Sequence, residues 1–252
     1  MFGIWYLYFI CYLEFIIWDL LSISSFLIFS NIFNMIDLQS ALFLYIIIIF
    51  SSIIHEYAHG WMAYQLGDST AERMGRLTLN PFAHIDPFGT VFLPLALLLT
   101  SGIFIGYAKP VPFDPRNLRN PRRDTSLVGI AGPASNILIA IVLGLIVRFF
   151  GDSLLSINAG TFFSSGLFVE FLRDIVLINI WLALFNLIPV PPLDGSKVLL
   201  GIIPKAFGGA YEAMERMGFA SIIIAIFIAG MVIPYLVYPL FNLFVGQPFI
   251  VF

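Results

Sequence analysis

The chain has 252 residues, of which 60% are hydrophobic and 11% charged, with a mean hydropathy of +0.98 and a net charge of −3. Soluble domains carry about 25% charged residues, so this composition excludes an ordinary soluble protein and indicates a polytopic membrane protein. The single cysteine, Cys11, excludes an internal disulfide and a cysteine-rich zinc site, and the basic residues are too few to indicate nucleic-acid binding.

Residues 2–33 form an apolar stretch that contains Glu14 and Asp19. The stretch lacks a basic start and a small-residue cleavage site, so it does not look like a signal peptide. It fits one long membrane helix or two partial ones, and Met35 offers an alternative start for the protein. We therefore treat residues 1–34 as a hydrophobic segment of uncertain role, separate from a main domain at 35–252.

Residues 55–59 read His-Glu-Tyr-Ala-His inside a membrane helix predicted for about 40–66. Positions i and i+4 share one helix face, so His55 and His59 can offer two imidazole nitrogens to one metal ion. Glu56 flanks that site and is suited to act as a general base, as in zinc hydrolases. Ionisable groups are costly at membrane depth and therefore indicate a function, which is either hydrolysis inside the bilayer or a proton or ion relay. A third metal ligand would favour hydrolysis.

A polar stretch follows this helix from Gly67 to Gly89. Within it, residues 75–81 alternate polar and apolar side chains and end in Asn-Pro, which predicts a short strand closed by a turn. His84 is expected to make local hydrogen bonds rather than to bind a metal. The next segment, 91–108, is apolar but broken by a proline and two glycines, which fits a re-entrant hairpin and leaves a tilted full span open.

Three more hydrophobic segments lie at about 126–149, 168–190 and 218–245. The loops at 109–125 and 196–217 are basic, whereas the loop at 151–167 has no Lys or Arg, so the positive-inside rule places both basic loops in the cytoplasm. Residues 204–217 are predicted as an interfacial amphipathic helix. In this topology the helix of residues 40–66 runs inwards, and its two histidines lie in the cytoplasmic half.

Residues 186–195 read Asn-Leu-Ile-Pro-Val-Pro-Pro-Leu-Asp-Gly and end the hydrophobic segment at 168–190. Their prolines cannot continue a helix, because each lacks an N–H group and its ring clashes with the preceding turn. The chain must unwind, and we expect Asp194 on an extended segment that lines a cavity at the depth of the histidines. Asp194 would complete a two-His, one-Asp metal site with a fourth position for water. The alternative is that Asp194 only caps a cytoplasmic helix, with Gly195 allowing the turn.

A Gly-Pro-x-x-Asn motif at 132–136 lies between the His-Glu-x-x-His motif at 55–59 and the proline-rich motif at 186–195. With these three motifs in this order, the chain resembles the site-2 protease family of intramembrane zinc metalloproteases. The resemblance runs from about Asp37 to the C-terminus and is nearest to the small prokaryotic branch without appended domains. It implies that one zinc ion per chain binds to three residues, which are His55, His59 and Asp194. It also implies that Glu56 is the catalytic base and that Asn186 lies near the reacting peptide, as a substrate or oxyanion contact.

The predicted fold class is an all-α polytopic membrane protein with about five to six transmembrane helices. A re-entrant or short extra hydrophobic segment and a small β element near the active site complete it. We expect Asn136, Pro192 and Gly195 to be structural residues near the site, with Asn136 hydrogen-bonded to another helix. The resemblance implies an intramembrane metalloprotease domain at 35–252.

The predicted function is zinc-dependent hydrolysis of peptide bonds in or near transmembrane segments of membrane proteins, for regulated intramembrane proteolysis or membrane-peptide clearance. The expected partners are the lipid bilayer and a membrane-protein or membrane-peptide substrate, and no nucleic acid is expected. The sequence does not indicate an oligomeric state. The expected location is the cell membrane, multi-pass, with the active site towards the cytoplasm. A membrane metal or proton transporter that uses the same residues is the alternative, although no internal repeat supports it.

Overall fold

The computed structural model describes residues 38–94, 96, 108–155, 166–202, 209 and 214–246. All regular secondary structure in these residues is helical, which confirms the predicted all-α class. The predicted N-terminal segment 1–34 lies outside the described residues. So do most of the predicted amphipathic helix at 204–217 and the second half of the predicted hydrophobic segment at 91–108.

Long helices provide the framework of the described chain, and short turns connect two of them. The longer helices are α3 (Leu38–Gln65), α6 (Pro121–Leu155), α7 (Leu167–Asn186), α8 (Asp194–Ile202) and α10 (Phe219–Val245). The polar stretch between α3 and α6 holds α4 (Thr70–Arg73), two 3-10 turns, η1 (Pro81–Ala83) and η3 (Pro115–Asn117), and one π-helical turn, η2 (Pro87–Phe92).

Each of these three turns begins with an Asn-Pro or Asp-Pro pair. Asn80, Asp86 and Asp114 each accept a hydrogen bond from a backbone N–H two residues later. Such side chains satisfy N–H groups at the start of a helical turn, and proline suits the first helical position because its missing N–H has no partner there. The sequence therefore dictates three tight turns in a stretch that has little hydrophobic patterning.

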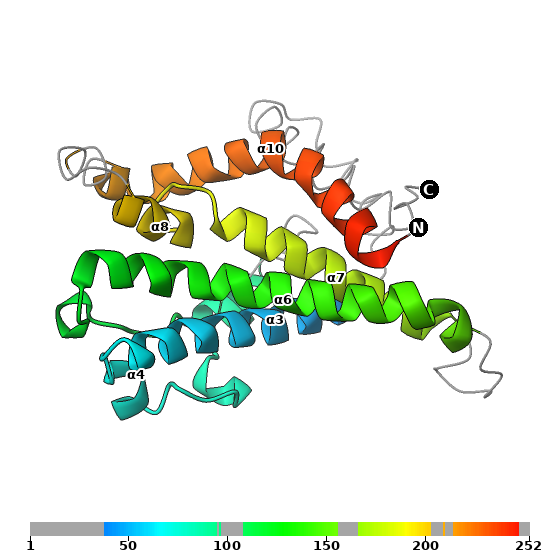
Figure 1. Cartoon of the computed structure of the whole chain (residues 1–252), viewed down its shortest axis with the longest axis horizontal. Helices are drawn as coiled ribbons and strands as arrows, with labels where there is room; N and C mark the ends of the chain where they lie inside the picture. Colours follow the sequence, from blue (N-terminus) through cyan, green and yellow to red (C-terminus); the bar gives the residue numbers. More distant parts are fainter. Residues whose placement is uncertain are drawn as a thin grey trace.

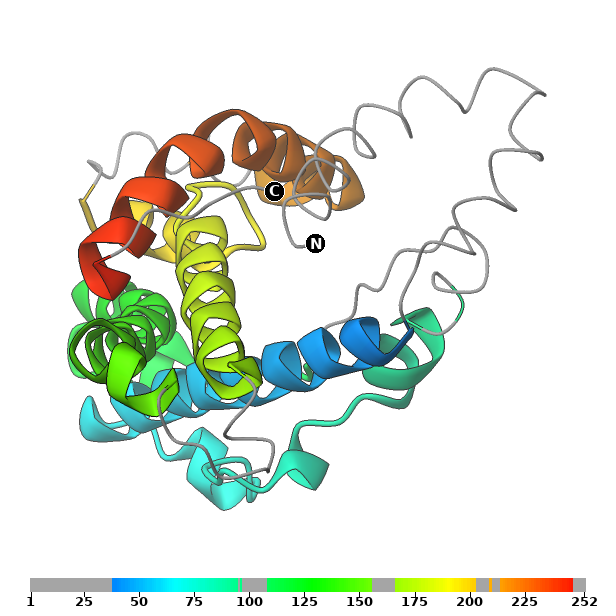
Figure 2. The same cartoon turned by 90° about the vertical axis from the view of Figure 1, so that its right-hand side faces the viewer.

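Helix α6 is the centre of the molecule, because it packs against α3, α7, α8 and α10. Figure 1 shows α6 and α3 running side by side, and Figure 2 shows α7 between α3 and α10. The apolar core is formed by α6, α7 and α10, with fully buried side chains such as Val176, Ile180 and Phe241. Close van der Waals packing in this core holds the three helices together, and the site lies at one end of the bundle, where α6 contacts both α3 and α8.

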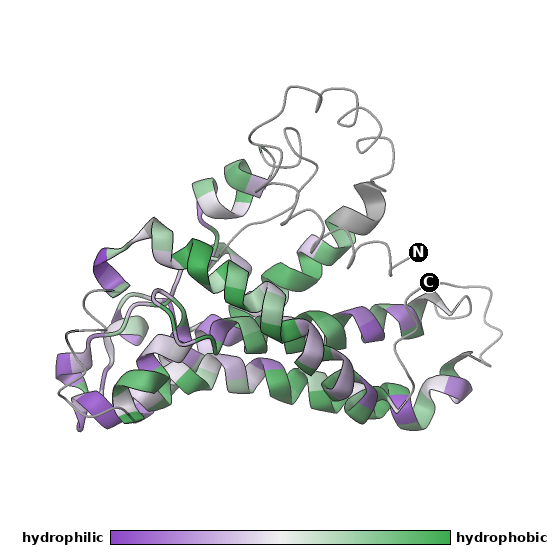
Figure 3. Cartoon of the chain, turned by 90° about the horizontal axis from the view of Figure 1, so that it is seen from above, coloured by the Kyte–Doolittle hydropathy of each residue, from purple (hydrophilic) through white to green (hydrophobic). Residues whose placement is uncertain are grey.

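Three helices in the described residues are long and apolar enough to cross a membrane: Leu42–Gln65, Pro121–Leu154 and Ala220–Val245. Helix α7 is also apolar, but its first two turns carry Glu170, Arg173 and Asp174. Large hydrophobic side chains on the outside of the spanning helices remain exposed, including Ile46 and Phe50 of α3 and Phe227 of α10. Such surfaces fit a lipid environment, so the molecule is a membrane protein. Figure 3 shows many hydrophilic residues gathered at the end that carries α4 and the start of α6.

The predicted β element at 75–81 is wrong for the described structure, which contains no strand there or elsewhere. Gly75 adopts a left-handed φ of 64° that turns the chain. Thr78 then uses both its oxygens locally, because its carbonyl contacts His84 Nε2 at 2.8 Å and its hydroxyl accepts from Asn80 N at 3.1 Å. Side chains that satisfy the nearby backbone in this way compete with a strand ladder, and alternation of polar and apolar residues could not reveal them.

A buried carboxylate, Asp68, ties the end of α3 to the segment before α6. It accepts hydrogen bonds from Thr70 N at 3.0 Å, Asp114 N at 2.6 Å and Asn117 Nδ2 at 2.9 Å. Burial acts to raise the pKa of Asp68, but these donors outweigh it and hold the pKa below its ordinary value. The carboxylate therefore stays charged and keeps residues 114–117 against the end of α3.

Candidate metal centre and active site

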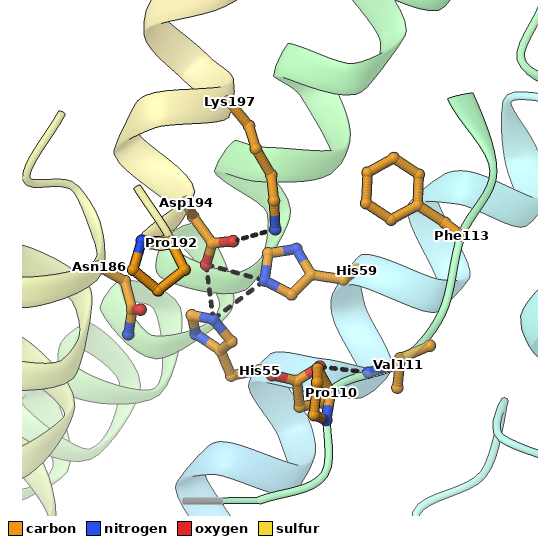
Figure 4. Close-up of a pocket in the computed structure, with 10 residues that line it drawn as sticks. His55, His59, Pro110, Val111, Phe113, Asn186, Pro192, Asp194 and Lys197 are labelled. Atoms are coloured by element: carbon orange, nitrogen blue, oxygen red, sulfur yellow. Dashed lines mark hydrogen bonds and ion pairs between the residues drawn. The ribbon is translucent and has the colours of Figure 1, made fainter. Parts of the chain in front are cut away.

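Three ligand atoms from two helices converge in a buried cluster (Figure 4). His55 and His59 project from one face of α3, and Asp194 begins α8. Asp194 Oδ2 lies 2.9 Å from Nε2 of each histidine, and the two Nε2 atoms lie 3.0 Å apart. The helical i, i+4 spacing thus brings the two imidazoles together as predicted, and the structure adds the predicted aspartate across 135 residues of sequence.

Asp194 reaches the cluster in a different way from the one expected. Helix α7 ends at Asn186, and the prolines of the following turn interrupt the helix as predicted. However, Asp194 is the first residue of α8 rather than part of an extended segment. Gly195 permits this arrangement, because a Cβ there would clash with the carbonyl of Leu187. The carboxylate therefore both starts a helix, where the helix dipole favours negative charge, and joins the histidines.

The other ring nitrogen of each histidine fixes which tautomer is present. His59 Nδ1 lies 2.7 Å from the carbonyl oxygen of Val128, which can only accept. His55 Nδ1 lies 2.5 Å from Asn136 Oδ1, while Asn136 Nδ2 donates to Asn179 Oδ1 at 2.8 Å. Both Nδ1 atoms are therefore donors, and in a neutral imidazole this leaves Nε2 with a free lone pair. Asn136 makes hydrogen bonds between helices and also orients the ring of His55.

This donor set fits a zinc ion. Two Nε2 atoms and a carboxylate oxygen face one another within about 3 Å, so with neutral imidazoles three acceptors meet with no proton between them. A cation is the simplest partner for them. Ligands at zinc–nitrogen distances of about 2.0–2.1 Å in a tetrahedron lie roughly 3.3 Å apart, close to the spacing observed. Two His and one Asp also leave a fourth position for water or substrate, the pattern of catalytic zinc sites.

Helix α6 lies close enough to the cluster to demand a glycine. A Cβ at Gly132 would clash with the Nε2 atoms of both His55 and His59. The Gly-Pro-x-x-Asn motif therefore has two separate contacts with the histidines. Its glycine leaves space at the two Nε2 atoms, and its asparagine accepts a hydrogen bond from the far side of His55.

Glu56 lies beside the cluster and is held by the backbone of a loop. Its Oε2 accepts a hydrogen bond from Val111 N at 2.7 Å, which leaves Oε1 available to the cavity. That cavity has a volume of about 140 Å³ and is lined by the following ten residues: His55, Glu56, His59, Pro110, Val111, Phe113, Asn186, Pro192, Asp194 and Lys197. A carboxylate fixed at one oxygen and open at the other is suited to exchange a proton with water in the cavity.

Asn186 and Pro192, which we expected near the site, line the cavity, and so do two other contributors that the sequence analysis missed. Asn186 donates one hydrogen bond from Nδ2 to Leu182 O at 2.9 Å and keeps its amide oxygen for other contacts. Lys197 was missed as a site residue, although its position one helical turn after Asp194 offered a signal. The contact of Val111 is a backbone contact and left no trace in the side-chain pattern. His84 lies outside the three-residue cluster and contacts Thr78 O, in keeping with the expected local role.

Comparisons with known proteins agree with this geometry. Residues 152–230 match the family model of Peptidase family M50. YwhC of Bacillus subtilis, named as a zinc metalloprotease, is 37% identical over 206 residues, which cover 79% of this chain and 86% of YwhC. Rip2 of Mycolicibacterium smegmatis, also named as a zinc metalloprotease, is 30% identical over 175 residues, which cover 69% of this chain and 62% of Rip2. No solved structure gives a significant match.

Proposed function

This chain belongs to peptidase family M50, the site-2 protease family, and from that membership we propose how its own residues carry out peptide hydrolysis. The chain is a membrane zinc metalloprotease that acts on peptide bonds and takes zinc as its cofactor. We assign the zinc ligands to His55, His59 and Asp194. We assign the catalytic base to Glu56.

The observation that best supports this assignment is the placement of Glu56 beside three converging acceptor atoms. Metal-assisted hydrolysis needs metal ligands that leave a position for water and a base beside them, and a two-His, one-Asp set next to Glu56 provides both. When bound, zinc would lower the pKa of a water molecule and stabilise the oxyanion as a Lewis acid. A proton relay or ion carrier would need no base held at one oxygen by the backbone and open to the cavity at the other.

Glu56 carries the proton in both halves of the reaction. Its free Oε1 removes a proton from the attacking water, while Val111 N–H steadies Oε2 and keeps the carboxylate aimed at the cavity. Protonated Glu56 then delivers that proton to the leaving amine. Asn186 lies on the opposite wall of the cavity, where its amide is placed to hydrogen-bond the reacting peptide. Pro192 and Gly195 shape the turn that brings Asp194 to the site.

The substrate is a protein segment within or near the membrane. A peptide bond in a helix is shielded and bonded to the preceding turn, so the segment must unwind before it reaches the cavity. Such cleavage serves regulated intramembrane proteolysis or the clearance of membrane peptides. One zinc ion per chain is sufficient for this chemistry.

We place the active site at the cytoplasmic face of a multi-pass protein in the cell membrane. The C-terminal half of α3, the start of α6 and helix α8 meet at one end of the bundle (Figure 1). The segments at this end carry most of the basic side chains: Arg73, Arg76, Lys109, Arg116, Arg119, Arg122, Arg123 and Lys197. Basic loops are retained in the cytoplasm, which supports this orientation.

The decisive experiment compares the wild type with Glu56→Gln in detergent and in liposomes. Both proteins should bind about one zinc ion per chain, because glutamine removes only the proton-transfer group. Cleavage of a model single-span substrate by the variant should be slower by about 10²–10⁴-fold. Cleavage by Glu56→Gln at the wild-type rate would refute the assignment of the base. Zinc flux through wild-type liposomes without peptide cleavage would favour a transporter instead.

A further inference from the structure

Lys197 is the positively charged residue among those that line the cavity, and no step of the reaction described above uses it. Helix α8 has nine residues, and Asp194 and Lys197 stand three positions apart on one face at its start. A cation near a helix N-terminus is disfavoured by the helix dipole. The helix dipole therefore does not explain the placement of Lys197.

The two oxygens of Asp194 have different partners. Oδ2 faces the two histidines at 2.9 Å each, whereas Oδ1 accepts a hydrogen bond from Lys197 Nζ at 2.8 Å. The side chain of Asp194 is 7% exposed and that of Lys197 is 30% exposed, so the contact is partly shielded from water. Figure 4 shows Lys197 extending to the side of the carboxylate away from His55.

Two further contacts confine the lysine side chain. Its stem runs past Gly129 of α6, where an added Cβ would lie 2.9 Å from Lys197 Cβ. Its ammonium group lies 5.7 Å from the centre of the Phe113 ring, a cation–π distance. Contacts from α6 and from the segment before it thus hold the ammonium group at Asp194 Oδ1, unlike a lysine at a solvent-exposed surface.

We propose that Lys197 is a positioning residue that occupies Asp194 Oδ1 and keeps this carboxylate a one-oxygen ligand of the metal. The proposal rests on the zinc site assigned above. A carboxylate that bound through both oxygens would take the position needed by water in a four-coordinate site. Hydrogen bonds to ligating carboxylates orient them in this way, and their loss changes metal affinity or activity by about 10–100-fold.

The test uses the full-length protein with Co²⁺ in place of zinc and, in parallel, the zinc enzyme. Lys197→Met removes the charge at similar length, Lys197→Gln keeps a hydrogen-bond donor, and Lys197→Arg keeps the charge. Arg123→Met is the control, because it removes a charge from an exposed position at the start of α6. Four-coordinate Co²⁺ absorbs visible light more strongly than five-coordinate Co²⁺, so the spectrum reports the binding mode of Asp194.

We expect Lys197→Met to weaken the visible absorption of bound Co²⁺ and to lower kcat by about 10–100-fold with little change in KM. Lys197→Gln should show the same direction with a smaller effect, and Lys197→Arg and Arg123→Met should stay close to the wild type. If Lys197→Met does not fold, the contrast between the Gln and Arg variants provides the same comparison.

An unchanged spectrum and kcat in Lys197→Met would overturn the proposal. A rise in KM with an unchanged spectrum would overturn it too, because Lys197 would then contact the substrate rather than orient the ligand. Asp194→Ala, measured beside these variants, separates the ligand role of Asp194 from the positioning role of Lys197. Zinc retention by Asp194→Ala refutes the ligand assignment itself, whereas zinc loss there with an unchanged Lys197→Met spectrum refutes only the role of Lys197.

Discussion

At the scale of single residues, the metal-facing nitrogen of His55 is selected by a side chain on the opposite side of the ring. Asn136 is fully buried and accepts from His55 Nδ1, and its own amide is oriented by Asn179. Asn179 is in turn fixed because its Nδ2 donates to Ser51 Oγ at 2.9 Å and to Ile175 O at 2.8 Å. One hydrogen-bonded chain across α3, α6 and α7 therefore determines the tautomer of His55, which we propose as a metal ligand.

We predict that Asn136→Leu lowers zinc affinity by about 10–100-fold, because the outer hydrogen bond of His55 is lost. Chelator competition on the purified protein measures this affinity. Ser135→Ala is the matched control, since among the described residues the hydroxyl of Ser135 bonds within its own helix, to Gly132 O at 2.7 Å. Equal affinities for the wild type and Asn136→Leu would show that the tautomer of His55 is set by another contact.

The sequence predicts the two histidines, Glu56 and Asp194 far better than the residues around them. The i, i+4 histidines and the adjacent glutamate follow from helical geometry, and prolines before Asp194 predict the break that brings it to the site. The roles of Lys197 and of Val111 N–H depend on which helix faces meet and on a backbone contact across 55 residues. Neither can be derived from periodicity within one segment.

At the scale of elements, the approach of α6 to α3 depends on a single missing methyl group. We predict that Gly132→Ala prevents stoichiometric zinc binding, since the new Cβ would clash with both imidazoles. It should also destabilise the protein by about 1–3 kcal/mol through overpacking. Zinc content and thermal unfolding in detergent measure these effects.

Gly230→Ala in α10 is the matched control, because a Cβ there meets no atom within 4 Å. Alanine is the better helix former by about 0.5–1 kcal/mol, so this variant should be as stable as the wild type or slightly more so. If Gly132→Ala behaves like Gly230→Ala, α6 does not approach the histidines as closely as described here.

The hydrogen bonds that the Asp68 carboxylate accepts predict that the stability of the protein depends on pH. The pKa of folded Asp68 lies below its ordinary value, so its contribution is complete above the unfolded pKa of about 4 and is lost as the pH falls through the folded pKa. Asp68→Asn should therefore cost about 1–3 kcal/mol near neutral pH, and the difference from the wild type should shrink in acid. Thermal unfolding from pH 8 to pH 3 tests this, with exposed Asp152→Asn as the reference for general acid effects. A constant difference across that range would contradict the prediction.

The contrast between the predicted strand and the observed turns is also a matter of elements. Alternation of polar and apolar residues at 75–81 favours a strand, but a strand also needs a partner, and no partner strand lies among the described residues. Arg76 instead turns into the protein and donates to the carbonyl of Lys109 at 2.7 Å. The segment therefore supports the loop that holds Glu56 and does not itself form an edge.

At the scale of the whole molecule, the two ends of the segment from 85 to 108 meet. Lys109 N donates to His84 O at 2.9 Å, which brings both ends to the same level of the protein. We predict that Asp86 and Asp114 face the same, cytoplasmic side of the membrane, so that the intervening hydrophobic segment re-enters rather than crosses. The number of spans in the whole chain remains a prediction.

Cysteine labelling measures this topology after replacement of Cys11. Reporters at Phe82 and Arg119, which are both exposed, should react with an impermeant reagent from the same side, and a reporter at exposed Asp152 should react from the other. Opposite labelling of the Phe82 and Arg119 reporters would make the segment a true span and would reverse the orientation of everything before it.

The separation of His55 and Asp194 by 139 residues has a consequence for biosynthesis. During translation α3 enters the membrane with both histidines and Glu56, but the third acceptor emerges from the ribosome only after α6 and α7 have been made. With the ligands proposed above, we expect a partly synthesised chain to lack a complete hydrolytic centre and to leave neighbouring membrane segments uncut. The enzyme would then become active only when its helices have assembled, so that folding itself delays the onset of cleavage.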